Sequence, residues 1–172
     1  MAGYIIPLAV AEAYIKKHSE DVKDYNKFIE GVVAPDSVSD KSITHYGEKS
    51  SKVNLKCFLE AKEIDDDYNK GYFLHLVTDY IFYNKFLECF SKSIIYNDYD
   101  ILNRKLQEKY KVKIPKGIEE SVFYKEGETK ILELESVIKF IEEVSDYKLS
   151  DIKERVLKND KYWLEFRKLR KI

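Results

Sequence analysis

The chain has few of the residues that interrupt regular structure: six glycines and three prolines among 172 residues. Because glycine and proline dominate tight turns, their scarcity disfavours a sandwich or barrel of short strands and favours helices. There are only two cysteines, Cys57 and Cys89, each within an apolar helical pattern. Two are too few for a disulfide framework, so we expect two buried free thiols.

Long apolar runs and an excess of one charge are also missing. No stretch of about 18 apolar residues occurs, so we expect no transmembrane segment. Residues 1–10 lack a basic region and are too short for a secretory signal, which makes the cytoplasm the expected location. Charged residues make up 35% of the chain but the net charge is only -1. This balance argues against a globally basic nucleic-acid-binding protein and against a highly charged disordered chain.

What the chain does contain is apolar residues at helical spacing, together with 14 tyrosines and nine phenylalanines. We predict an all-α fold, a single-domain multi-helix bundle of about seven or eight helices. The expected helices cover residues 7–18, 22–30, 53–62, 68–91, 99–110, 135–144, 151–157 and 161–169. Pro115-Lys116-Gly117 is the clearest boundary. It divides the domain, residues 1–172, into a metal-site helical core (1–114) and a C-terminal helical extension (115–172).

Several local features are expected from turn and cap chemistry. Gly31 is a plausible stop for the second helix, and Ser150 a good N-cap for the helix that follows it. Pro35 favours extended geometry at Ala34, so that Asp36 emerges from a sharp turn. Residues 121–134 fit either a short hairpin or a helix with an irregular start.

The longest apolar stretch, from about Tyr68 to Phe90, carries His75 and Asp79 in its middle. A spacing of four places both side chains on one face of a helix. A buried aspartate is costly unless it is paired, hydrogen-bonded or bound to a metal. Asp36 and His45 lie upstream, and two imidazoles with two carboxylates suit Zn²⁺. Taken singly, His75 could be a satisfied core histidine and His45 an exposed loop residue.

The order of these residues resembles the zinc-dependent phospholipase C family, particularly its small cytoplasmic bacterial branch. The wider superfamily includes the S1/P1 single-strand nucleases. The resemblance covers roughly residues 1–110 and rests on three motifs: Ala34-Pro35-Asp36, Thr44-His45-Tyr46, and Gly71-Tyr72 followed by His75 and Asp79. It implies a helical bundle of the phospholipase C/P1 nuclease type. It also implies a zinc site made by Asp36, His45, His75 and Asp79, with Asp79 able to bridge to a second zinc.

The chain departs from this family at two places. No histidine follows Asp79, and Lys85 stands six residues beyond it. Pro7 occupies the region where members carry an early histidine. A three-zinc site is therefore not available. One zinc is expected, and a second would need ligands such as the N-terminal amine, Asp98 or Asp100.

The resemblance implies a zinc-dependent hydrolase of phosphoesters that acts on a small-molecule or lipid substrate. Zinc would activate a water molecule, Asp36 or Asp79 would orient it, and Tyr46, Tyr72 and Tyr83 would line the substrate site. One alternative is a non-catalytic helical binding protein with one structural zinc, because four protein ligands close a tetrahedral shell. Another is a nuclease on the same scaffold. The basic C-terminal helix could contact an anionic surface or simply present a solvated face.

Overall fold

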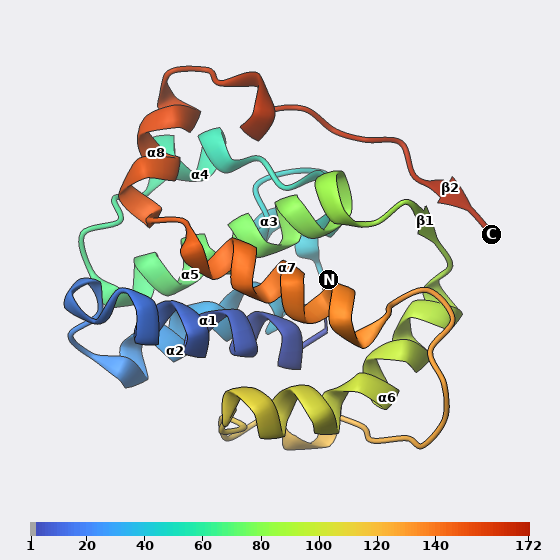
Figure 1. Ribbon diagram of the computed structural model, residues 1–172. Helices are drawn as coiled ribbons and strands as arrows, with labels where there is room; N and C mark the ends of the chain where they lie inside the picture. Colours follow the sequence, from blue (N-terminus) through green and yellow to red (C-terminus); the bar gives the residue numbers. More distant parts are fainter. Residues whose placement is uncertain (1–2) are drawn as a thin grey trace.

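The computed structural model describes residues 3–172, and within them the fold is all-α, as predicted (Figure 1). The eight α-helices of this part are α1 (Ile5–Lys17), α2 (Tyr25–Val33), α3 (Lys41–Thr44), α4 (Leu55–Ala61), α5 (Asp67–Ile81), α6 (Lys92–Tyr110), α7 (Leu134–Asp146) and α8 (Leu149–Leu157). Two short strands, β1 (Cys89–Phe90) and β2 (Arg170–Lys171), pair in parallel. No helix among these residues combines the length and apolarity needed to cross a membrane.

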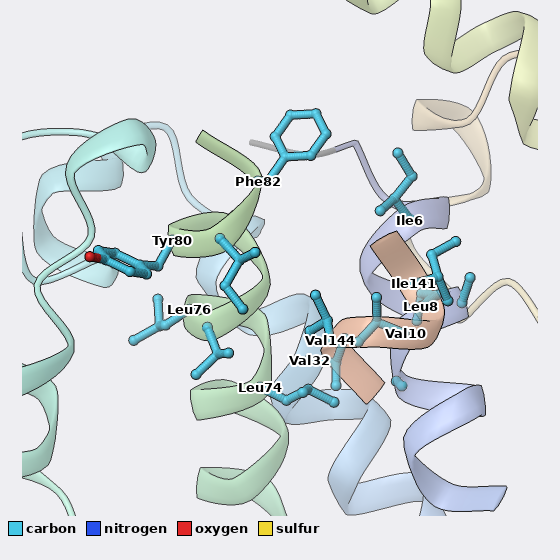
Figure 2. Close-up of a cluster of buried hydrophobic side chains, with 14 of the residues drawn as sticks. Ile6, Leu8, Val10, Val32, Leu74, Leu76, Tyr80, Phe82, Ile141 and Val144 are labelled. Atoms are coloured by element: carbon cyan, nitrogen blue, oxygen red, sulfur yellow. The ribbon is translucent and has the colours of Figure 1, made fainter. Parts of the chain in front are cut away.

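The core forms where α5 packs among α1, α2 and α7 (Figure 1). Every residue of α5 from Phe73 to Ile81 is buried, as expected for a helix that is apolar nearly all round. On α7 the buried positions recur at intervals of three and four residues, so that helix covers the core with one face only. Figure 2 shows the side chains that meet there, contributed by all four helices: Ile6, Leu8, Val10, Val32, Leu74, Ile141 and Val144.

Helices α2 and α5 touch backbone to backbone through a pair of glycines. A Cβ atom on Gly31 would lie 2.0 Å from the carbonyl oxygen of Tyr68, and one on Gly71 would lie 2.0 Å from that of Phe28. Each glycine therefore makes room for the other helix. The prediction that Gly31 ends the second helix was wrong: α2 continues to Val33, because this glycine serves the helix contact rather than a cap.

The chain leaves α2 through a 3-10 helix, Ala34–Asp36, instead of an extended turn. Ala34 has φ -57° and ψ -42°, so the expected extended geometry before Pro35 was wrong. Proline lacks an N–H group, but in the first turn of a helix that group has no partner to lose. The turn closes when the amide of Ser37 donates to the carbonyl of Ala34 at 3.1 Å. Asp36 thus follows α2 directly.

The central helix is shorter than predicted, because α5 ends at Ile81 and a π-helical turn, Phe82–Phe86, follows. Asn84 explains the change. Its side-chain amide donates to the carbonyls of Tyr80 (3.0 Å) and Ser51 (3.3 Å). A side chain that bonds to a backbone carbonyl of its own helix competes with the regular ladder.

The predicted last helix, residues 161–169, was also wrong. Only Lys161–Trp163 is helical, of the 3-10 type, and the chain then runs extended to β2 (Figure 1). Asp160 does cap this turn, as expected, by accepting from the amide of Tyr162 at 3.0 Å. The backbone beyond it is held by α5 and the π-helical turn: the Tyr80 hydroxyl accepts from the amide of Glu165 at 3.0 Å, and Asn84 Oδ1 accepts from that of Arg167 at 2.8 Å. The basic residues from Arg167 to Lys171 therefore lie on an extended segment and not on a helix, whereas Lys153 and Arg155 lie on α8.

Four smaller expectations also changed. Helix α6 begins at Lys92, seven residues before the predicted start, and α8 begins at Leu149 without a side-chain cap from Ser150. Residues 121–134 form neither a hairpin nor an α-helix. The cysteines are free, as predicted, but Cys57 is exposed and Cys89 only half-buried.

Candidate metal centre

Four predicted ligands meet in one cluster. Asp36 ends the 3-10 helix after α2, His45 follows α3, and His75 and Asp79 lie one turn apart on α5. One ligand atom from each residue lies within 4.8 Å of all the others, and all four residues are buried. Segments separated by about 40 residues in sequence thus supply a single site that could hold a metal ion.

The distances within the cluster fit a tetrahedral ion. His45 Nε2 lies 3.0 Å from Asp79 Oδ2 and 3.6 Å from Asp36 Oδ1. His75 Nε2 lies 3.3 Å from Asp79 Oδ2 and 3.6 Å from Asp36 Oδ2. Ligand atoms at normal zinc distances on a tetrahedron are about 3.3 Å apart. These four separations lie close to that value, and the whole set of ligand atoms lies within 4.8 Å, so the cluster could hold such an ion.

The orientation of His75 is set by the contact between α2 and α5. Its Nδ1 lies 2.7 Å from the carbonyl oxygen of Val32. A carbonyl can only accept, so Nδ1 carries the hydrogen and donates it. Nε2 is then the atom that faces the two carboxylates, the arrangement found in metal-binding histidines.

His45 is oriented in the same way by its own loop. Its Nδ1 lies 3.2 Å from the carbonyl oxygen of Lys41 and 3.0 Å from the hydroxyl of Thr44. The Tyr72 hydroxyl donates to the carbonyl of Thr44 at 2.6 Å, which ties this loop to α5. The chain then turns tightly, since a Cβ atom on Gly47 would lie 1.9 Å from the carbonyl oxygen of Lys52. Both imidazoles thus present Nε2 to the same point.

Several polar atoms of the cluster have no hydrogen-bond partner among residues 3–172. They are both carboxylate oxygens of Asp36 and Nε2 of His75. An unpaired buried polar group costs about 1–3 kcal/mol, more when it is charged. A divalent ion at the centre would bind Nε2 of His75 and one oxygen of Asp36, so the residues present fit a metal.

Charge within the cluster shifts two pKa values in opposite directions. Burial alone would raise the pKa of Asp79, but nearby positive charge, that of His75 included, and the 3.0 Å contact with Nε2 of His45 hold it well below its usual value. Burial alone would lower the pKa of His75, but the charges of Asp36 and Asp79 outweigh burial and raise it. Without an ion, a proton on His75 partly balances the carboxylates.

The three tyrosines predicted to line a substrate site lie around the cluster. Tyr72 fixes the His45 loop, and the ring of Tyr46 packs edge-on against Phe58 with centroids 5.3 Å apart. Tyr83 lies one turn beyond Asp79, and burial followed by the charge of Asp79 raises its pKa well above the usual value. Their contact with a substrate stays a prediction.

The two aspartates considered as ligands for a second ion lie outside the cluster. Asp98 is buried and accepts from the backbone amides of Lys130, Ile131 and Leu132 at 2.7–3.2 Å. Asp100 lies 3.6 Å from the ammonium of Lys125. Lys85 stacks over the ring of Tyr162 at 4.3 Å. The N-terminal amine lies outside the described residues. Asp98 and Asp100 thus have structural partners and do not join the cluster.

Two contacts at the cluster have no counterpart in the sequence motifs. The ammonium of Lys41 lies 2.8 Å from the carbonyl oxygen of Asp36, and the Tyr4 hydroxyl donates to the same oxygen at 3.2 Å. The only sequence signal for Lys41 is its position four residues before His45. That spacing brings its carbonyl beside the imidazole but says nothing about its side chain.

These residues define a class of protein. It is an all-α bundle with a buried cluster of two histidines and two aspartates that could hold a metal ion. A surface cavity of about 630 Å³ at the start of α6 includes none of the four ligands. No family model, no curated protein and no solved structure matches the chain.

Proposed function

We propose that Asp36, His45, His75 and Asp79 hold a zinc ion, and that the protein is a zinc-dependent hydrolase of phosphoesters resembling phospholipase C. The observation that supports this best is the buried set of four ligands whose only unpaired polar atoms face one another. The donors are nitrogen and oxygen alone. Structural zinc sites are rich in cysteine, whereas catalytic ones commonly combine histidine with a carboxylate.

Zinc bound there would polarise a phosphoryl oxygen and lower the pKa of water beside it to about 7. The chain's own residues have separate roles. Asp36 and Asp79 together cancel the charge of a divalent ion, and either carboxylate can orient the attacking water. The backbone carbonyls of Val32 and Lys41 hold the two imidazoles in the tautomer that leaves Nε2 for the ion.

Elemental analysis of the untagged protein, beside Asp79→Ala, tests the metal site. We expect about one zinc per chain in the wild type and loss of that zinc in the variant, together with lower stability, because metal-binding free energy adds to folding free energy. His18→Ala is the matched control: this histidine lies at the end of α1 with Nε2 2.9 Å from the carbonyl oxygen of Ser145. The His18→Ala protein should keep its zinc. Zinc that stays in Asp79→Ala contradicts the site.

Activity is tested on the zinc-loaded protein with a lipid-like chromogenic phosphodiester and a single-stranded oligonucleotide, side by side. We expect hydrolysis of the phosphodiester that stops on chelation and returns with zinc. Cleavage of the oligonucleotide alone would instead indicate a nuclease. The absence of both activities in protein that holds its zinc would contradict the hydrolase.

A structural role for the zinc is the second candidate. The observation that favours it is the burial of all four ligands, which leaves little of the cluster exposed to solvent. A closed shell of four protein ligands is also typical of structural sites. In that case, removal of zinc would lower the melting temperature of a protein that hydrolyses neither substrate.

A further inference from the structure

Lys41 lies against both loop ligands of the cluster. It is the first residue of α3, and its side chain turns back toward the 3-10 helix that ends at Asp36. The ammonium lies 2.8 Å from the carbonyl oxygen of Asp36 and 3.6 Å from Asp36 Oδ1. The carbonyl of Lys41 accepts from the imidazole of His45. One residue therefore contacts two ligands, with its charge beside Asp36.

Lys41 also lies between the ligands and solvent. Its side chain is 24% exposed, whereas those of Asp36 and His45 are fully buried. A lysine ammonium has three N–H donors. The bond to the carbonyl of Asp36 uses one, and the 3.6 Å approach to Oδ1 is too long to be a hydrogen bond. Donors remain for a group that arrives from outside.

The charge around the site matches a particular kind of substrate. A divalent ion bound by Asp36 and Asp79 makes a neutral centre. The ammonium of Lys41 is then the single positive charge among the described groups that contact these carboxylates. Once Asp36 binds the ion, its carboxylate attracts the ammonium less. A phosphodiester carries one negative charge, which this lysine can pair through a charge-assisted hydrogen bond.

We propose that Lys41 binds the anionic oxygen of a phosphodiester positioned at the metal centre, so that the site prefers monoanionic diesters to neutral esters. This inference rests on the proposed function. Lys41 acts as a substrate-binding residue: it touches the phosphoryl group and neither holds the ion nor moves a proton.

The test compares zinc-loaded wild type with Lys41→Gln, Lys41→Arg and Lys49→Gln, an exposed lysine of the same loop that serves as the control. Steady-state kinetics use bis(p-nitrophenyl) phosphate as the monoanionic diester and p-nitrophenyl acetate as the neutral ester. We expect Lys41→Gln to raise KM for the diester about tenfold, the loss of one charge-assisted hydrogen bond, while KM for the neutral ester changes by less than about twofold. Zinc content should be unchanged, Lys41→Arg should restore most of the binding, and Lys49→Gln should match the wild type.

Binding of dimethyl phosphate to the same zinc-loaded proteins, measured by calorimetry, separates this inference from the hydrolase. If the wild type binds the diester without turnover and Lys41→Gln binds it about tenfold more weakly, the hydrolase fails and the role of Lys41 stands. Equal affinity of the two proteins overturns the role of Lys41, as does a wild type that does not bind the diester. Loss of zinc from Lys41→Gln also overturns it, because the lysine would then maintain the metal centre.

Discussion

Two buried aspartates show how different the surroundings of one residue type can be. Asp98 is fully buried and saturated, because the three backbone amides of residues 130–132 donate to its carboxylate. Asp36 is also buried, yet neither of its carboxylate oxygens has a hydrogen-bond partner among the described residues. The first pattern is typical of a carboxylate that stabilises a loop, and the second of a carboxylate that could bind a cation.

Asp98→Ala is therefore expected to destabilise the protein without affecting its metal. The change leaves three amides unpaired, at least one of them buried, and should lower the free energy of unfolding by about 3 kcal/mol. Urea denaturation measures this, and elemental analysis should still find zinc. Asp100→Ala, which removes a partly exposed partner of Lys125, should cost less than about 1 kcal/mol. Zinc loss from Asp98→Ala alone would show that this residue serves the metal centre after all.

At this scale the sequence predicted the cluster and missed what supports it. All four ligands could be named. A buried His75 and Asp79 need partners, and Asp36 and His45 stand in the order expected from the resemblance to the zinc-dependent phospholipase C family. The carbonyls of Val32 and Lys41 could not be found, since every residue has a carbonyl and only the fold decides which one meets a ring. The side chain of Lys41 looked like any other loop lysine.

Among the helices, the contact between α2 and α5 positions the candidate metal centre. Gly31 and Gly71 let the two backbones meet, and that closeness puts the carbonyl of Val32 within 2.7 Å of His75. The same closeness brings Asp36, which follows α2 directly, to the face of α5 that carries Asp79. A wider separation would move ligands on one helix away from those on the other.

Gly71→Ala should therefore damage the fold and the metal centre together. The new methyl group would meet the carbonyl of Phe28 at 2.0 Å, so the helices must move apart. We expect a loss of about 3 kcal/mol in the free energy of unfolding and weaker zinc binding, measured by denaturation and by competition with a chelator. Glu30→Ala, next to this contact on the exposed face of α2, is the control and should cost less than about 0.5 kcal/mol. Unchanged zinc affinity in a destabilised Gly71→Ala would separate the helix contact from the metal centre.

The ends of elements were harder to predict than their existence. The helical periodicity of α7 is a local signal, and that helix was found. The end of α5 depends on Asn84, whose amide also donates to Ser51, 33 residues earlier in sequence. The extended C-terminal segment depends on Tyr80 and Asn84, whose backbone partners lie more than 80 residues away. Local propensity favoured helix at both places, and these distant hydrogen bonds prevailed over it.

For the molecule as a whole, a bound ion would join three segments: the 3-10 helix after α2, the loop after α3, and α5. Without the ion, these segments meet through attractive histidine–carboxylate contacts and through repulsion between the two carboxylates. Two carboxylates share the cluster, and without an ion their repulsion is offset in part by protonated His75. Its pKa is raised in the folded protein, so the stabilisation it gives is complete below its unfolded pKa of about 6.5 and is lost as the pH rises through the folded value. The pKa of Asp79 is lowered, so its contribution is present above about 3.9 and is lost only as the pH falls through the folded value.

The metal-free protein should thus be most stable between these two pH values and lose stability toward alkaline pH. The zinc-loaded protein should not lose stability toward alkaline pH. Zinc needs His75 deprotonated, so its binding strengthens over the range in which the metal-free protein loses stability. Zinc at 100 times its dissociation constant would add about 2.7 kcal/mol. Thermal unfolding from pH 5 to 9, with chelator and with zinc, measures both curves, and the difference in melting temperature should widen as the pH rises. His75→Gln should remove the alkaline loss in chelator and the gain in zinc alike. A difference that is constant over this range would mean that His75 holds no proton in the metal-free cluster.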